Sequence, residues 1–247
     1  MINNKKLENY VNTLLNTEKI KDYCPNGLQV EGKKNIRNIT TGVSISVELI
    51  NSAIDQKTDA IFVHHGLFWK NESQIITGIK YKRIELLIKN NINLFAYHLP
   101  LDIQESLGNN VALAKILNLT ISKTNIFDYG IECKTQYSLK TLIQKITECL
   151  KRPPLVVGNI EERKIKKVAI CTGAGQTFIE DAHKIGADVY ISGEISERTT
   201  IVARELKMTY IAAGHHATEK YGILALGNHL EKKFAINHTF INIENPA

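Results

Sequence analysis

Short apolar segments alternate with amphipathic segments through the first part of the chain, and this alternation restricts the possible folds more than any other feature. The apolar runs are rich in β-branched residues, whereas apolar residues in the segments between them recur at helical spacing. Strands are therefore predicted at residues 36–43, 59–63 and 92–97, and helices at residues 4–20, 46–55 and 83–89. This order is typical of a largely parallel α/β sheet.

The second half of the chain repeats the order. Strands are predicted at residues 167–171, 187–193 and 208–213, and helices at residues 176–184 and 199–206. We therefore predict an α/β fold of two similar halves with mixed, mostly parallel sheets. A different segment separates the repeats, with strands expected at residues 129–134 and 155–157 and a helix at residues 139–150.

Two domains are expected, residues 1–123 and residues 124–247. A last helix at residues 220–232 and a strand at residues 239–243 close the chain. These two elements could pack on the first half.

Five of the eight histidines lie where predicted strands end. His64 and His65 follow the strand at residues 59–63, His98 follows the strand at residues 92–97, and His215 and His216 follow the strand at residues 208–213. In each half the last strand is followed by a histidine and, four residues later, by a carboxylate. The candidate ligands are His64, His65, His98, Asp102, His215, His216 and Glu219.

The ends of parallel strands meet at one edge of a sheet, where ligands bind. Imidazole is the commonest protein ligand for metals, and sets of histidine and carboxylate without thiolate suit Zn, Mn, Fe or Co. Adjacent histidines at one strand end could each reach a different ion, and paired ions are a common hydrolytic device. We therefore expect the two halves to enclose one metal cleft.

Each carboxylate also has a structural interpretation. Asp102 could cap a following helix, and Glu219 could be a first-turn acid that complements a helix dipole. Glu194 could contact a substrate, act as a base, or simply begin a helix. The lone histidines, His183, His229 and His238, are assigned no role.

The segment Thr172-Gly173-Ala174-Gly175-Gln176 lies between a predicted strand and a predicted helix and resembles a phosphate-cradling turn. It lacks the full GxGxxG spacing and the lysine of a Walker motif. We favour the alternative that a tight turn requires glycine there.

Composition points to a cytoplasmic globular protein. The four cysteines form no CxxC pair, no apolar run could span a membrane, and the first residues lack a signal-peptide core. The net charge of +6 would suit nucleic acid, but only residues 163–167 form a dense basic block. General abundance of lysine explains the charge better than a nucleic-acid surface does.

Four motifs in order resemble the NIF-three-like dinuclear metal-binding family, whose bacterial members are labelled GTP cyclohydrolase 1 type 2 homologues. The motifs are residues 22–30, 63–70, 98–102 and 214–219. The resemblance implies two divalent metal ions held by His64, His65, Asp102, His215 and Glu219, with Glu219 bridging the ions and His98 and His216 beside them. It also implies a toroidal homohexamer, a trimer of dimers whose metal sites face an inner cavity.

A dinuclear metal-dependent hydrolase acting on GTP or a related nucleotide is the first functional hypothesis. A metal-dependent phosphatase or phosphodiesterase is the nearest enzymatic alternative. The alternative from another class is a non-catalytic metal-binding ring scaffold that binds nucleic acid or protein.

Overall fold

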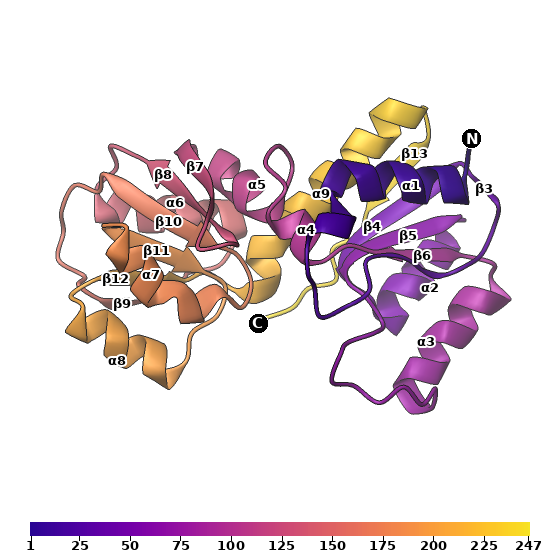
Figure 1. Ribbon diagram of the computed structural model, residues 1–247, viewed down its shortest axis with the longest axis horizontal. Helices are drawn as coiled ribbons and strands as arrows, with labels where there is room; N and C mark the ends of the chain where they lie inside the picture. The colour runs from indigo at the N-terminus through magenta and orange to yellow at the C-terminus, as the bar shows by residue number, and fades with distance from the viewer. The chain divides into compact units, whose positions relative to one another are not determined.

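The computed structural model describes all residues from 1 to 247 and contains a five-stranded sheet, a six-stranded sheet and a two-stranded ribbon (Figure 1). The strands are β1 (Ile2–Asn3), β2 (Gly27–Val30), β3 (Asn35–Ile36), β4 (Asn38–Ser44), β5 (Ala60–His65), β6 (Asn93–Ala96), β7 (Thr120–Ile126), β8 (Gly130–Lys134), β9 (Leu155–Gly158), β10 (Lys167–Cys171), β11 (Val189–Ser192), β12 (Thr209–Ala212) and β13 (Asn237–Phe240). The α-helices are α1 (Asn4–Leu15), α2 (Val47–Asp55), α3 (Gly78–Lys89), α4 (Leu99–Asp102), α5 (Asn109–Ile116), α6 (Leu139–Leu150), α7 (Ile179–Lys184), α8 (Glu197–Glu205) and α9 (His215–Phe234). Two 3₁₀ turns, η1 (Thr17–Lys19) and η2 (Gly175–Phe178), complete the elements.

The chain forms two compact units. The first comprises residues 1–104 and 223–244, and the second comprises residues 105–222 and 245–247. The sequence placed the boundary between residues 123 and 124, which falls inside β7. This strand pairs with β8 and packs with α5 in the second unit, so the preceding helix belongs there as well.

The first unit is built on the sheet of order β13-β4-β5-β6-β2. Strands β13, β4, β5 and β6 run parallel, whereas β2 is antiparallel to β6 at the edge. Helices α2 and α3 cover one face, where Leu49 and Leu87 pack against Ile61 and Val63 of β5. Helix α1 lies on the opposite side of the sheet (Figure 1) and receives a hydrogen bond from the hydroxyl of Tyr97.

Local signals at both ends define α1. The side chain of Asn3 accepts hydrogen bonds from the first-turn N–H groups of Lys5 and Lys6, which caps the helix. At the other end Asn16 has a positive φ of 52°, a left-handed conformation that stops the helix at Leu15 rather than at the predicted residue 20.

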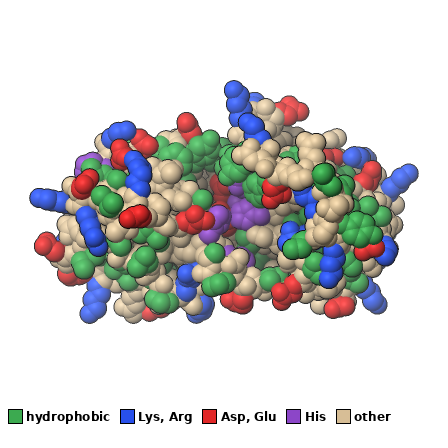
Figure 2. Space-filling view, turned by 90° about the horizontal axis from the view of Figure 1, so that it is seen from below, with side chains coloured by type: hydrophobic (Ala, Val, Ile, Leu, Met, Phe, Trp, Pro, Cys, Tyr) green, Lys and Arg blue, Asp and Glu red, His purple; other side chains and the backbone are tan.

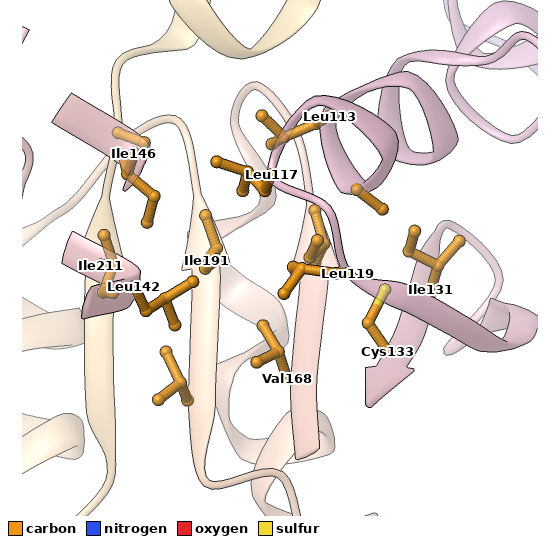
Figure 3. Close-up of a cluster of buried hydrophobic side chains, with 14 of the residues drawn as sticks. Leu113, Leu117, Leu119, Ile131, Cys133, Leu142, Ile146, Val168, Ile191 and Ile211 are labelled. Atoms are coloured by element: carbon orange, nitrogen blue, oxygen red, sulfur yellow. The ribbon is translucent and has the colours of Figure 1, made fainter. Parts of the chain in front are cut away.

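The second unit is built on the sheet of order β7-β8-β10-β11-β12-β9. Strands β10, β11 and β12 are parallel, and antiparallel strands flank them on both sides. Helices α5 and α6 cover one face, where Leu117, directly after α5, and Leu142 of α6 meet Val168, Ile191 and Ile211 in a hydrophobic core (Figure 3). Helices α7 and α8 pack on the other face.

The predicted fold class is confirmed. Strands β4, β5 and β6 alternate with α2 and α3, and β10, β11 and β12 alternate with α7 and α8 in the same parallel order. The sequence did not predict β2, β7 or α5, because the four residues of β2 are too few for a periodic signal, β7 is a polar edge strand, and α5 is a short helix that begins with two asparagines. None of the helices combines the length and the apolar character that a membrane span requires.

Candidate metal centre

The first unit brings His64 and Asp102 together. His64 is fully buried at the end of β5, and its Nδ1 lies 2.9 Å from the carbonyl oxygen of Tyr97. Because a carbonyl oxygen only accepts, Nδ1 of the neutral ring carries the proton and Nε2 presents its lone pair. Nε2 of His64 lies 3.4 Å from Oδ1 of the buried Asp102.

His65 is the last residue of β5, and its ring lies beside that of His64. The ring centroids are 4.6 Å apart and the planes are tilted by 49°. Successive strand residues point to opposite faces, so this proximity arises only because the strand ends here. Nδ1 of His65 lies 2.8 Å from the hydroxyl of Ser44, the residue beside it in β4, which fixes the ring orientation.

Asp102 ends the one-turn helix α4, which begins directly after His98. The capping interpretation of Asp102 is wrong, because the residue at the N-cap of the next helix, α5, is Gly108. The carboxylate of Asp102 is instead directed at Nε2 of His64.

The sequence did not predict the carboxylate that holds His98. Oδ1 of Asp22 lies 3.0 Å from Nδ1 of His98, and Oδ2 accepts from the N–H of Leu99 and the amide of Asn26. The amide oxygen of Asn26 in turn accepts from the N–H of His98 at 2.8 Å. Asp22 also accepts the N–H groups of Tyr23 and Cys24, so the whole turn is arranged around one carboxylate.

These contacts lower the pKa of Asp22. Burial alone would raise the pKa, but the hydrogen bonds from His98, Asn26 and Leu99 outweigh burial and hold the pKa of Asp22 well below its usual range. The ring of His98 lies 5.0 Å from that of His64 and 5.7 Å from that of His65, centroid to centroid. The ligand-capable atoms of His64, His65 and His98 all lie within 4.8 Å of one another.

The second unit brings His215 together with two carboxylates. His215 begins α9, and Glu219 follows one helical turn later, so both project from the same side of the helix. Nδ1 of His215 lies 2.7 Å from Oε1 of Glu194, and Nε2 lies 3.1 Å from Oε2 of Glu219. Helix α9 begins at His215, whereas the sequence predicted a start at residue 220. The chain turns into the helix at Gly214, whose φ is +99°.

Glu219 does not complement the helix dipole, because the first turn of α9 contains no acid and the side chain of Glu219 is buried. Burial lowers the pKa of His215, but the hydrogen bonds that its ring donates to Glu219 and Glu194, together with the negative charges of those carboxylates, outweigh burial and raise the pKa from 6.5 to about 9. Glu194 thus holds the Nδ1 proton of His215 and directs Nε2 toward Glu219.

The absence of a side chain at Gly173 leaves room for the carboxylate of Glu219. The backbone of Gly173 has a φ of +63°, and a Cβ there would lie 2.0 Å from Oε1 of Glu219. The N–H of Gly173 already donates to the hydroxyl of Thr218, and its carbonyl accepts from the N–H groups of Gly193 and Glu194. These contacts favour the tight-turn interpretation of this glycine-rich segment over a phosphate cradle.

The remaining histidines have other contacts. His229 bonds to the hydroxyl of Tyr10, His238 bonds to the hydroxyl of Thr41, and His183 is exposed on α7. His216 donates its backbone N–H to the carbonyl oxygen of Ala247. None of these contacts indicates a ligand role.

Both sets of side chains suit a divalent ion by the chemistry of their donors. His64 and His215 each have Nδ1 engaged by an acceptor, which leaves Nε2 as the donor atom beside a buried carboxylate. Such outer contacts are typical of metal-binding histidines. Zn, Mn, Fe and Co all accept imidazole and carboxylate ligands.

The fold and these clusters define a class: an α/β protein with two mixed sheets and buried histidine–carboxylate clusters that could bind metal ions. The family model Duf34/NIF3 (NGG1p interacting factor 3) matches residues 2–246, and the chain belongs to this family.

Relatives match over the whole chain. The chain is 48% identical over 252 residues to the GTP cyclohydrolase 1 type 2 homolog of Haemophilus influenzae and 48% identical over 258 residues to that of Vibrio cholerae, with full coverage of each chain. It is also similar to a solved structure described as protein ybgI, of unknown function, with a TM-score of 0.96, 43% identity and full coverage of both chains.

Proposed function

We propose that the protein is a dinuclear metal-dependent hydrolase that acts on GTP or a related nucleotide. The observation that supports this most is the arrangement of His64 and His215. In each, one ring nitrogen is fixed by an acceptor while the other lies within 3.4 Å of a buried carboxylate. An imidazole nitrogen and a carboxylate oxygen this close together are donor atoms that suit a divalent cation.

Five residues are proposed as ligands of two divalent ions: His64, His65, Asp102, His215 and Glu219. When bound, such ions lower the pKa of water and polarise substrate oxygens. Glu194 keeps a proton on Nδ1 of His215, and Ser44 fixes the ring of His65, so both rings are oriented before an ion binds.

The nucleotide substrate is suggested by the relatives, which are named GTP cyclohydrolase 1 type 2 homologs. To test this, the purified protein loaded with each of Zn, Mn, Fe and Co is incubated with GTP, and products are separated and weighed by mass spectrometry. We expect a hydrolysed product that the His65→Ala variant does not form. A mass identical to GTP in every metal form would refute the assignment to GTP.

The same experiment separates the enzymatic alternatives. Opening of the purine ring adds water to the base, whereas a phosphatase or phosphodiesterase releases phosphate or a nucleoside monophosphate. Measuring inorganic phosphate in parallel therefore distinguishes the two reactions.

A ring scaffold that binds nucleic acid has less support. In Figure 2 the lysine and arginine side chains are interspersed with acidic side chains, whereas a nucleic-acid surface needs clustered basic residues. Self-association into a toroidal homohexamer remains part of the proposal. Sedimentation should then give a mass about six times the 27.8 kDa of one chain.

A further inference from the structure

A cavity of about 650 Å³ opens in the first unit beside the turn that holds His98. Its lining includes Asp22, Tyr23, Trp69, Lys70, Glu72 and Lys80. The two loops that form its walls are joined by a hydrogen bond of 2.9 Å from the N–H of Lys70 to the carbonyl oxygen of Tyr23. Its volume is in the range of cavities that bind small molecules.

Two aromatic rings form the wall nearest to His98. The centroids of Tyr23 and Trp69 are 5.9 Å apart, and each ring meets the ring of His98 nearly at right angles, at 5.0 Å and 5.2 Å. Tyr23 is 51% exposed although its ring is large and apolar. An aromatic surface that stays open to solvent at a cavity wall suits a planar ligand that can stack on it.

One lysine of the cavity is placed to meet an anionic ligand. The carboxylate of Asp22 is turned to His98 and to the N–H groups of its own loop. The ammonium group of Lys80 donates to the carbonyl oxygen of Ser73 at 2.7 Å and lies 3.7 Å from Glu72, so these two charges offset each other, whereas Lys70 is exposed at the rim. Lysine binds phosphate as a point charge, so Lys70 can receive a phosphate beside the stacking rings.

We propose that this cavity binds a planar heterocycle that carries a phosphate, with the ring stacked on Trp69 and Tyr23 and the phosphate at Lys70. In taking the heterocycle to be a nucleobase, the inference rests on the proposed function. It places the substrate base next to His98, the histidine that Asp22 orients.

Trp69 is the one tryptophan of the sequence, so its fluorescence reports directly on this cavity. GMP is titrated into the full-length protein as purified, with guanosine and ribose 5-phosphate as partial ligands. We expect saturable quenching by GMP and at least tenfold weaker binding of either partial ligand. Absence of saturable quenching up to millimolar GMP would overturn the inference.

Two variants test the two parts of the cavity. Tyr23→Leu removes a stacking ring and Lys70→Ala removes a cation, and each should weaken GMP binding about tenfold. Tyr81→Leu is the matched control, because Tyr81 is 50% exposed but lies outside the cavity. Thermal unfolding shows whether each variant is folded, and unchanged affinity in both folded cavity variants would refute the assignment.

The outcome is distinguishable from failure of the proposed function. If GMP binds in a manner that depends on Tyr23 but GTP is never converted, the cavity assignment stands and the hydrolase assignment fails. If GTP is converted with an unchanged KM by Tyr23→Leu and Lys70→Ala, the hydrolase assignment stands and the cavity assignment fails.

Discussion

Replacing Gly173 with alanine tests whether the backbone of the second unit is shaped around Glu219. The added Cβ would lie 2.0 Å from Oε1 of Glu219 and 3.2 Å from Nε2 of His215, so the carboxylate has to move. A positive φ of +63° adds about 1–2 kcal/mol for any residue with a Cβ. Overpacking a buried position adds about 1–3 kcal/mol more.

Gly186→Ala supplies the matched control. Gly186 has a φ of +74°, but no heavy atom lies within 4 Å of the position of its Cβ, so this variant has the backbone strain without the clash. Gly186→Ala should therefore lower the free energy of unfolding by about 1–2 kcal/mol, and Gly173→Ala by about 2–5 kcal/mol.

Urea unfolding and metal analysis of both variants provide the measurements. Gly186→Ala should retain the metal content of the wild type, whereas Gly173→Ala should lose most of it because Glu219 is displaced. The reasoning is refuted if Gly173→Ala unfolds like Gly186→Ala and retains its metal.

Further predictions concern the groups that orient the histidines. Glu194→Gln should weaken metal binding by about 10-fold to 100-fold, as measured by competition with a chromogenic chelator, because the amide holds His215 less firmly; wild-type affinity would contradict this. In metal-free protein the pKa of His215 is raised to about 9, so its contribution to stability is complete below pH 6.5 and is lost as the pH rises through 9. Melting temperatures between pH 6 and 10 should show this decline, and Glu194→Gln should reduce it. Asp22→Asn should lower the free energy of unfolding by about 1–3 kcal/mol, because a buried acceptor of several N–H groups is lost; an unchanged urea midpoint would argue against this role. Since the pKa of Asp22 is depressed, its contribution is present above its normal pKa near 3.8 and is lost only at lower pH.

The sequence was sufficient to predict the parallel strands that place most of the candidate ligands. Residues 60–63 are continuously apolar and Ile61, Phe62 and Val63 are β-branched or aromatic, so a buried strand ending at His64 and His65 follows from the sequence alone. The recurrence of histidine and acid four residues apart was equally visible at His98 and Asp102 and at His215 and Glu219.

The partners of these histidines required the fold. Asp22 is 76 positions from His98 in sequence, and only the pairing of a turn with the end of β6 brings them together. The sequence feature that points to Asp22 is the turn Asp22-Tyr23-Cys24-Pro25-Asn26-Gly27, in which the carboxylate precedes backbone N–H groups that it can accept. Glu194 directly follows a predicted strand, but its contact with His215 depends on the parallel register of β11 and β12.

The steric requirement for glycine at position 173 could not be predicted from the sequence pattern. The glycine-rich turn after β10 suggested either phosphate or a tight turn, and only the distance from Gly173 to Glu219 shows why a side chain is excluded. The start of α9 was placed after Glu219 because His215, His216 and Thr218 are polar and mask the helical periodicity.

The number of metal ions bound by Glu219→Gln tests the central claim most directly. A neutral amide bridges two cations poorly, so elemental analysis should find two equivalents of divalent metal in the wild type and far less than one in Glu219→Gln. Glu231→Gln, on the same helix α9, is the control and should retain two equivalents. Two full equivalents in Glu219→Gln would contradict the assignment of Glu219 as the ligand shared by both ions.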